Sequence, residues 1–326
     1  MPELLLERCR RVLVTGGAGF IGGAVVRHCL QPLARLQVAL RLSLCRSPVA
    51  RRSTIGALRA QESSSSPKRQ LLLLLVAYHP SAQEVEQLRA CLAELSSSVG
   101  YAVVVNDHQP GEPMDQVAAD ADLFLRRQDN LGYGRAINRL VASLGKLPPY
   151  IGVLNTDLFW QPGTFERLLD WLQLNPQVNL AVPQILDETG SPQKLCKQHP
   201  TVLGLFSRRF VPDWLKPNWL KRYDRWFVMS DQDYHDVFEA PYLSGCCMVI
   251  RSEAFRRAGG FDERYFLYLE DADLTRSLAL DGHCVHLPLA EVIHNWGRGN
   301  YRNLGLMAVN LCSAWKYFCK WGWKIY

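Results

Sequence analysis

After an irregular N-terminal segment, the chain alternates apolar runs of strand length with amphipathic stretches of helix length, and this alternation constrains the fold most. The first pair is an apolar run at Leu71–Ala77 followed by a helical pattern at about 82–95. Further strands are expected at 102–105 and 151–154, and a further helix at 163–174. Strands that alternate with helices form a parallel sheet with crossover helices on its faces. The sequence therefore predicts an α/β fold, a doubly wound and mostly parallel sheet flanked by helices.

The basic excess of the sequence lies in its N-terminal segment. Residues 1–70 hold 12 of the 37 Lys and Arg residues and three acids, so the net charge of +6 divides into +9 there and −3 on the remainder. Because nucleic-acid binding needs a basic face on the domain that binds, we expect no nucleic-acid partner for the main body. A Ser-rich run closed by proline at 63–68 predicts a linker between domains at 1–66 and 67–303.

A glycine-rich turn, Thr15–Gly22, stands near the N-terminus between a short apolar strand and a helical pattern. Its glycines would let a pyrophosphate approach backbone N–H groups. The run resembles the opening of extended short-chain dehydrogenases such as nucleotide-sugar 4,6-dehydratases. However, no acid stands between Glu7 and Glu62 to hold a ribose, and no tyrosine is followed four residues later by lysine. We therefore interpret residues 1–66 as a truncated Rossmann-like remnant, with an NAD(P)-dependent dehydratase or reductase as the alternative.

The cysteines and the apolar runs bear on the compartment. The ten cysteines form no C-x-x-C pair, which favours reduced thiols in a cytoplasmic protein. No apolar run approaches the roughly 18 to 20 residues that span a bilayer, and the first residues lack the apolar stretch of a secretory signal. We expect a cytoplasmic protein, with peripheral contact to the inner face of the membrane as an open alternative.

Seven motifs follow one another along the main body. They are Leu71–Pro80, Val103–Asp107, Asn130–Asn138, Leu154–Asp157, Leu243–Arg251, Gly259–Phe266 and Tyr268–Leu274. In order and sequence they resemble family 2 glycosyltransferases of the GT-A fold, especially rhamnosyltransferase-like members, over about residues 70–300. Each polar group after a strand is by itself an ordinary turn or helix start.

The resemblance implies a nucleotide-sugar donor and a set of residues that bind it. Tyr78 would meet the nucleobase, and Asp107 would hold the base or the ribose. The remaining donor-binding residues that it implies are Asn130, Gly132, Asn155, Ser244, Gly245 and Arg298. The Cys246–Cys247 pair has apolar neighbours, which favours packing over thiol chemistry.

The resemblance also implies a divalent cation, Mg²⁺ or Mn²⁺, at the donor diphosphate. Leu154–Asp157 is similar to the family's Asp-x-Asp motif in a variant form. A hard cation needs carboxylate oxygens, so Asp157 is the candidate ligand. His294 resembles the late histidine that completes the metal site in related enzymes.

Two adjacent acids, Glu270 and Asp271, open an amphipathic helical pattern. The resemblance implies that Asp271 is the general base of the reaction and that Glu270 orients it or the acceptor. Acids in the first turn of a helix are also ordinary caps, so a structural role is the alternative.

Two segments point to the acceptor. Residues 206–236 mix arginines and lysines with tryptophans, as a sugar-stacking, lipid-facing or packed insertion would. Residues 304–326 form a third unit, an aromatic and basic helix that would either lie in a membrane interface or pack on the catalytic domain.

The function that the resemblance implies is an inverting, metal-dependent glycosyltransferase of cell-envelope polysaccharide synthesis. It would move a sugar, with rhamnose from dTDP-rhamnose as the candidate, to a hydroxyl of a glycan or lipid-linked acceptor. A non-catalytic carbohydrate-binding relative is a further alternative, which the presence of both Asp157 and Asp271 disfavours.

Overall fold

The computed structural model describes residues 69–294 and 304–326. The glycine-rich turn at 15–22, the linker at 63–68 and Arg298 lie outside the described residues, so the predictions about them stay predictions. The same holds for the domain boundaries at residues 66 and 303. The described residues 69–294 and 307–326 belong to one compact unit.

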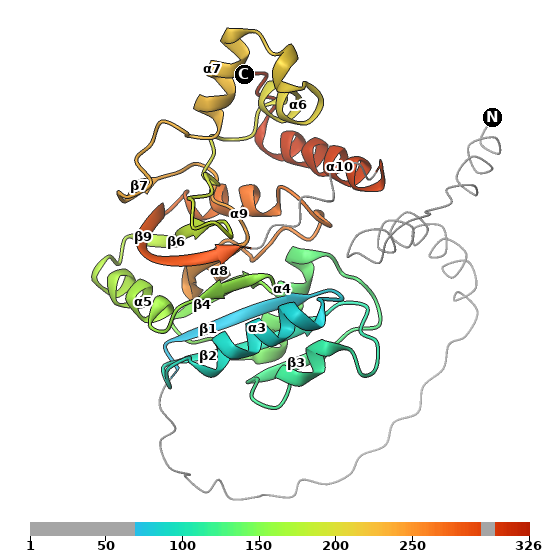
Figure 1. Ribbon diagram of the computed structural model, residues 1–326, viewed down its shortest axis with the longest axis vertical. Helices are drawn as coiled ribbons and strands as arrows, with labels where there is room; N and C mark the ends of the chain where they lie inside the picture. The colour runs from blue at the N-terminus through green and yellow to red at the C-terminus, as the bar shows by residue number, and fades with distance from the viewer. Residues whose placement is uncertain (1–68, 295–303) are drawn as a thin grey trace, which may run out of the picture. The chain divides into compact units, whose positions relative to one another are not determined.

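In the described part of the chain, nine strands form one sheet (Figure 1). Four parallel strands make up its first half, in the order β3-β2-β1-β4. They are β1 (Leu71–Ala77), β2 (Val99–Val105), β3 (Leu123–Arg126) and β4 (Tyr150–Asn155). All seven residues of β1 are buried, as expected for a central strand covered on both faces.

The second half of the sheet continues from β4 and mixes directions. It consists of β8 (Cys247–Arg251), β6 (Val178–Leu186), β9 (His283–His294) and β5 (Leu158–Trp160), with β7 (Phe238–Glu239) paired to β9. β8 is antiparallel to both β4 and β6, and β9 is parallel to β6. Six of the described strands therefore run one way and three the other. The predicted α/β fold with a mostly parallel sheet is confirmed.

Helices flank this sheet. They are α3 (Ala82–Ala93), α4 (Tyr133–Leu144), α5 (Thr164–Leu174), α8 (Ser252–Arg257) and α9 (Glu270–Leu278), with a 3₁₀ turn at Pro113–Val117. α4 packs against β1 and β2, and α5 against β6 and β9. The capping box that Ser81 and Glu84 form explains why α3 begins where it does. The predicted strands and helices are present and differ by a few residues at their ends.

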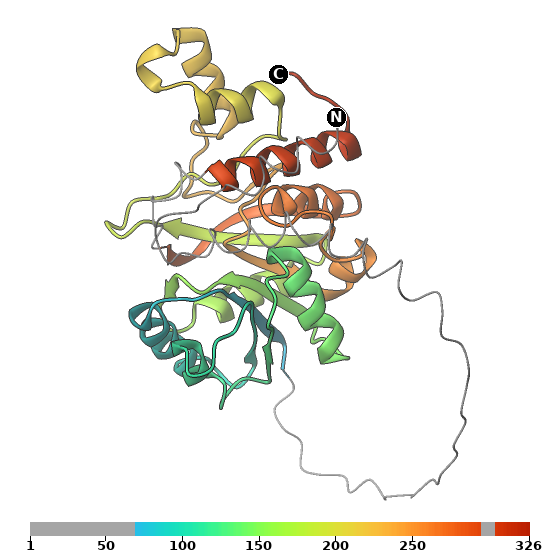
Figure 2. The same cartoon turned by 90° about the vertical axis from the view of Figure 1, so that its right-hand side faces the viewer.

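The two segments assigned to the acceptor are helical. α6 (Val202–Phe210), a short 3₁₀ turn (Asp213–Leu215) and α7 (Asn218–Phe227) form an insertion, and α10 (Leu304–Trp321) closes the chain. In Figures 1 and 2 the insertion lies at the same end of the molecule as the C-terminus. No helix among the described residues is long and apolar enough to cross a membrane.

Candidate active site

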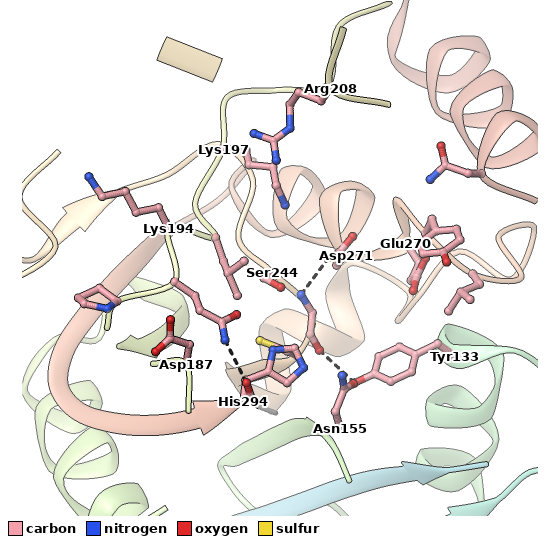
Figure 3. A pocket seen from close by; sticks show the side chains of 18 of the residues that line it. Tyr133, Asn155, Asp187, Lys194, Lys197, Arg208, Ser244, Glu270, Asp271 and His294 are labelled. Atoms are coloured by element: carbon pink, nitrogen blue, oxygen red, sulfur yellow. Dashed lines mark hydrogen bonds between the residues drawn. The ribbon is translucent and has the colours of Figure 1, made fainter. Parts of the chain in front are cut away.

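The carboxyl ends of the parallel strands meet at one edge of the sheet, where α/β folds bind ligands. A cavity of about 1040 Å³ opens there. Six of the predicted site residues line it, namely Asn155, Ser244, Gly245, Glu270, Asp271 and His294 (Figure 3). They come from the ends of β4 and β9, from the loop before β8 and from the start of α9. Residues far apart in the sequence thus converge on one cavity.

The carboxylate of Asp271 is held in place by the loop before β8. Its Oδ2 accepts hydrogen bonds from the backbone N–H of Gly245, at 2.9 Å, and from the hydroxyl of Tyr242, at 3.2 Å. A Cβ at position 245 would lie 2.9 Å from the Cβ of Asp271, which explains a glycine there. Tyr133 donates a hydrogen bond to the carbonyl of Gly245 and so ties α4 to this loop. The carboxylate is therefore oriented and still faces the cavity.

Glu270 differs sharply from its neighbour. Its side chain is buried, and its Oε2 has no hydrogen-bond partner among the described residues. Burial, with a smaller contribution from the charge of Asp271, raises the pKa of Glu270 to about 8. Glu270 is therefore mostly protonated at neutral pH and can donate a hydrogen bond, whereas a general base must be ionised to accept a proton.

The backbone just before α9 is strained. Tyr268 and Leu269 have φ angles of 70° and 63°, in the left-handed region that side chains with a Cβ disfavour. Tyr268 also lines the cavity. Strain of this kind clusters at functional sites. No local pattern in the sequence predicts it, because neither residue is a glycine or an asparagine.

Asp157 and His294 come together although 137 positions separate them in the sequence. The pairing of β5 with β9 sets Leu158 opposite His294, which brings His294 beside Asp157. The Nε2 of His294 lies 3.4 Å from the Oδ2 of Asp157. Asp157 Oδ1 and His294 Nδ1 are buried and have no hydrogen-bond partner within the described ranges.

This pair fits a divalent cation in part. Two neighbouring ligands on Mg²⁺ at about 2.1 Å lie roughly 3 Å apart, close to the separation of the two side chains. No group of three or more His, Cys, Asp or Glu side chains among the described residues could hold a metal by itself. A cation here would consequently need further ligands, which diphosphate oxygens can supply.

The residues predicted to hold the nucleoside form a separate group. Tyr78 and Asp107 follow β1 and β2, and Gly132 is the N-cap of α4. Gly132 has a φ angle of 81°, and a Cβ there would overlap the carbonyl oxygen of Phe266. The side chain of the preceding Asn130 accepts a hydrogen bond from the backbone N–H of Gly132 at 2.8 Å.

None of these four residues is part of the wall of the cavity described above. A buried asparagine, Asn106, links the end of β2 to the start of α4, since its side chain accepts from the backbone N–H of Leu131 and donates to the carbonyl of Gly132. The adjacent Tyr133 does line the cavity. Of the predicted nucleoside residues, Gly132 is therefore directly adjacent in sequence to a residue of the cavity wall.

Three basic side chains on the cavity wall were not assigned to the site from the sequence. They are Lys194, Lys197 and Arg208 (Figure 3). The Nζ of Lys197 lies 4.3 Å above the ring centre of Tyr242, and burial lowers the pKa of this lysine. Arg208 comes from α6, in the segment assigned to the acceptor. Lys194 and Lys197 stand in an irregular stretch after β6, where the sequence carries no motif that would single them out.

The described cysteines do not point to thiol chemistry. All seven are free, and Cys246 and Cys247 are buried. Burial raises the pKa of the Cys246 thiol to about 12, far from the thiolate form that reactive cysteines need. This agrees with a packing role for the pair.

Two kinds of comparison identify relatives, whereas no protein-family model matches the chain. The N-acetylglucosaminyl-diphospho-decaprenol L-rhamnosyltransferases of two strains of Mycobacterium tuberculosis are each 32% identical to it over 239 residues, which cover 69% of this chain and 76% of the relative. Among solved structures, GalNAc-T7 with UDP, GalNAc and Mn²⁺ matches with a TM-score of 0.55 at 12% identity.

That structural match covers 79% of this chain and 49% of the other, so the chain spans about half the length of that protein, and it supports the fold alone. The relatives give no support to a dehydratase-like N-terminus. The identity to the mycobacterial enzymes extends over most of both chains. The GT-A fold of the structural match and the six predicted site residues on one cavity wall are consistent with this relationship. The chain therefore belongs to the family of these rhamnosyltransferases and is a glycosyltransferase of the GT-A fold.

Proposed function

We propose that this glycosyltransferase transfers rhamnose from dTDP-rhamnose, with inversion, to a hydroxyl of a lipid-linked diphosphate sugar in cell-envelope synthesis. The observation that carries the proposal is the oriented carboxylate of Asp271 on the wall of the cavity. The identity to the mycobacterial enzymes supports the sugar and the class of acceptor.

Inversion needs a single in-line displacement. The acceptor oxygen attacks the anomeric carbon while the bond from that carbon to the diphosphate breaks, and Asp271 takes the proton of the acceptor hydroxyl. The Gly245 N–H and the Tyr242 hydroxyl hold one oxygen of Asp271 in position. Protonated Glu270 cannot accept the proton of the acceptor hydroxyl. We therefore propose that Glu270 orients the acceptor.

The diphosphate of the donor lies, in this proposal, against Asp157 and His294. A bound Mg²⁺ or Mn²⁺ would be held by these two side chains and would neutralise charge on the leaving diphosphate. The approach of His294 Nε2 to Asp157 Oδ2, together with the buried Asp157 Oδ1 that has no hydrogen-bond partner among the described residues, supports this assignment. Tyr78, Asp107, Asn130 and the adjacent Gly132 would hold the nucleoside, with Asn155, Ser244 and the predicted Arg298 near the diphosphate.

The acceptor side of the site is basic. Lys194, Lys197 and Arg208 line the cavity, and Arg208 belongs to α6 of the insertion. A lipid-linked acceptor that carries a diphosphate would place its negative charges against such side chains. We therefore assign these three residues to the acceptor diphosphate and not to the donor.

A thermal-shift panel tests the donor. dTDP-rhamnose, UDP-sugars and GDP-sugars are added with and without Mn²⁺, because a ligand that binds the native state raises the melting temperature. We expect the largest shift with dTDP-rhamnose and Mn²⁺. A larger shift with another sugar nucleotide would overturn the donor, and a shift with NAD and with none of the sugar nucleotides would favour the dehydratase alternative.

A transfer assay tests the acceptor. With a short-chain, water-soluble N-acetylglucosaminyl diphosphate lipid, Arg208→Gln should raise the acceptor KM and leave the donor-induced shift unchanged. Equal KM values for the parent and the variant would refute the assignment of Arg208. The parent should use an acceptor without the diphosphate much less well than the diphosphate lipid. With that acceptor, the parent and Arg208→Gln should have equal activity.

A further inference from the structure

The exposed tryptophan and phenylalanine side chains of the described residues all lie in two segments, the insertion at 202–228 and the C-terminal residues 307–326. Trp214 is 80% exposed. The others include Phe206, Trp219 and Trp226 of the insertion and Trp315 and Trp323 near the C-terminus. Single exposed apolar residues are normal, but clustered aromatic ones mark an interaction surface.

Basic residues accompany these aromatics. The insertion holds six Lys and Arg residues and two acids, Asp213 and Asp224, and residues 307–326 hold three lysines and no acid. Lys216 pairs with both acids of the insertion, at 2.8 and 2.7 Å. The other basic residues of the insertion, among them the exposed Lys221 and Arg222, therefore give this surface a net positive charge.

The two segments adjoin one another. The backbone N–H groups of Val202 and Leu203, at the start of α6, donate to the carbonyl oxygens of Lys324 and Ile325, each at 2.9 Å. Figures 1 and 2 show α6, α7 and the C-terminus at one end of the molecule. We call the exposed aromatic and basic side chains of 202–228 and 307–326 the aromatic-basic face.

A folded scaffold supports this face. The inner side of α10 packs on α9, where Trp321 and Lys320 bond to Asp273 and Tyr317 is buried. Trp315 lies on the outer side of the same helix and is 62% exposed. One side of the C-terminal helix thus packs on the catalytic domain, which was one of the two alternatives, and the other side is exposed.

We propose that the aromatic-basic face docks the enzyme on an anionic lipid bilayer. Aromatic rings with interleaved Lys and Arg match a membrane interface, where apolar burial adds to attraction by anionic headgroups. A second copy of this chain fits less well, because it would present the same positive charge. Arg208 is exposed on α6 and also lines the cavity, so the site adjoins this face. The proposal rests on the surface residues and holds whatever the donor sugar is.

The test uses the full chain with vesicles of equal parts phosphatidylglycerol and phosphatidylcholine, and with vesicles of phosphatidylcholine alone. The parent should sediment with the first and much less with the second. Lys221→Gln combined with Arg222→Gln removes two charges and should weaken binding about thirtyfold. Trp214→Ser combined with Trp219→Ser should weaken it about tenfold or more.

Leu174→Ser with Leu280→Ser is the matched control, since both leucines are exposed outside this face, at 83% and 76%. It should bind vesicles as the parent does. All variants should keep the donor-induced thermal shift and the transfer rate to a water-soluble acceptor, so that a wrong function and a wrong surface give different results.

Either of two outcomes would overturn the proposal. One is equal sedimentation of the parent and both face variants with the anionic vesicles. The other is no sedimentation of the parent with these vesicles. If the parent then forms dimers that Trp214→Ser with Trp219→Ser abolishes, as sedimentation equilibrium would detect, the face binds a second copy.

Discussion

Replacement of Asp271 by asparagine separates a catalytic role from a structural one. The amide oxygen of the new side chain can occupy the place of Oδ2 and keep the hydrogen bonds from the Gly245 N–H and the Tyr242 hydroxyl, at 2.9 and 3.2 Å in the parent. Its NH₂ group would then face the N–H of Ala272, which donates to Oδ1 in the parent. We expect a stability loss of about 1 kcal/mol from this one contact.

The effect of Asp271→Asn on turnover should be far larger. An amide cannot accept the proton of the acceptor hydroxyl, and loss of a general base typically lowers the rate by roughly a hundred- to ten-thousand-fold. Donor affinity should stay near that of the parent, because the nucleoside residues and the Asp157–His294 pair are untouched. The test compares the parent and Asp271→Asn in melting temperature, in donor-induced thermal shift and in the rate of transfer to the same acceptor.

Asp273→Asn is the matched control on the same helix. Asp273 is buried and accepts hydrogen bonds from Trp321 Nε1 at 2.7 Å and Lys320 Nζ at 2.8 Å, which link α9 to α10. Removal of a buried charge from its partner costs on the order of 3 kcal/mol. This variant should lose stability while its folded fraction keeps most of its turnover. Near-normal transfer by Asp271→Asn, or an activity loss that merely follows its melting temperature, would refute the base assignment.

Three further predictions follow from the site. Asp157→Ala and His294→Ala should each abolish the Mn²⁺-dependent part of the donor-induced thermal shift with the fold intact, and full activity in EDTA would contradict both assignments. Because burial raises the pKa of Glu270 from 4.5 to about 8, the contribution of Glu270 to the stability of the parent is most favourable below pH 4.5 and declines as the pH rises toward 8. Glu270→Gln removes this loss, so its melting temperature relative to the parent should rise across that window; parallel curves would exclude a raised pKa. Gly132→Ala should cost more than about 2 kcal/mol in denaturant unfolding, whereas Gly111→Ala, with a similar φ of 80° and open space, should cost less.

The sequence predicts best what is local. Strand lengths, helix starts and the polar residues after β1, β2 and β4 follow from periodicity and motifs, since each depends on residues close together in the chain. The approach of His294 to Asp157 depends instead on the antiparallel pairing of β5 with β9, which no local pattern specifies. Lys197 was missed for the same reason, because its place above Tyr242 results from an isolated bridge between irregular segments.

The three acids in the first turn of α9 show why the structure is needed to assign roles. By sequence, Glu270, Asp271 and Asp273 are equally good helix-start residues. In the structure their partners differ. Within the described part of the chain, Glu270 is buried without a partner for Oε2, Asp273 is bonded to Lys320, and Asp271 accepts hydrogen bonds from the Gly245 N–H and the Tyr242 hydroxyl. The first is held protonated and the second is neutralised by a cation. Of the three, only Asp271 therefore lines the cavity with its carboxylate fixed by hydrogen bonds from uncharged donors, which is the arrangement that the proposed proton abstraction needs.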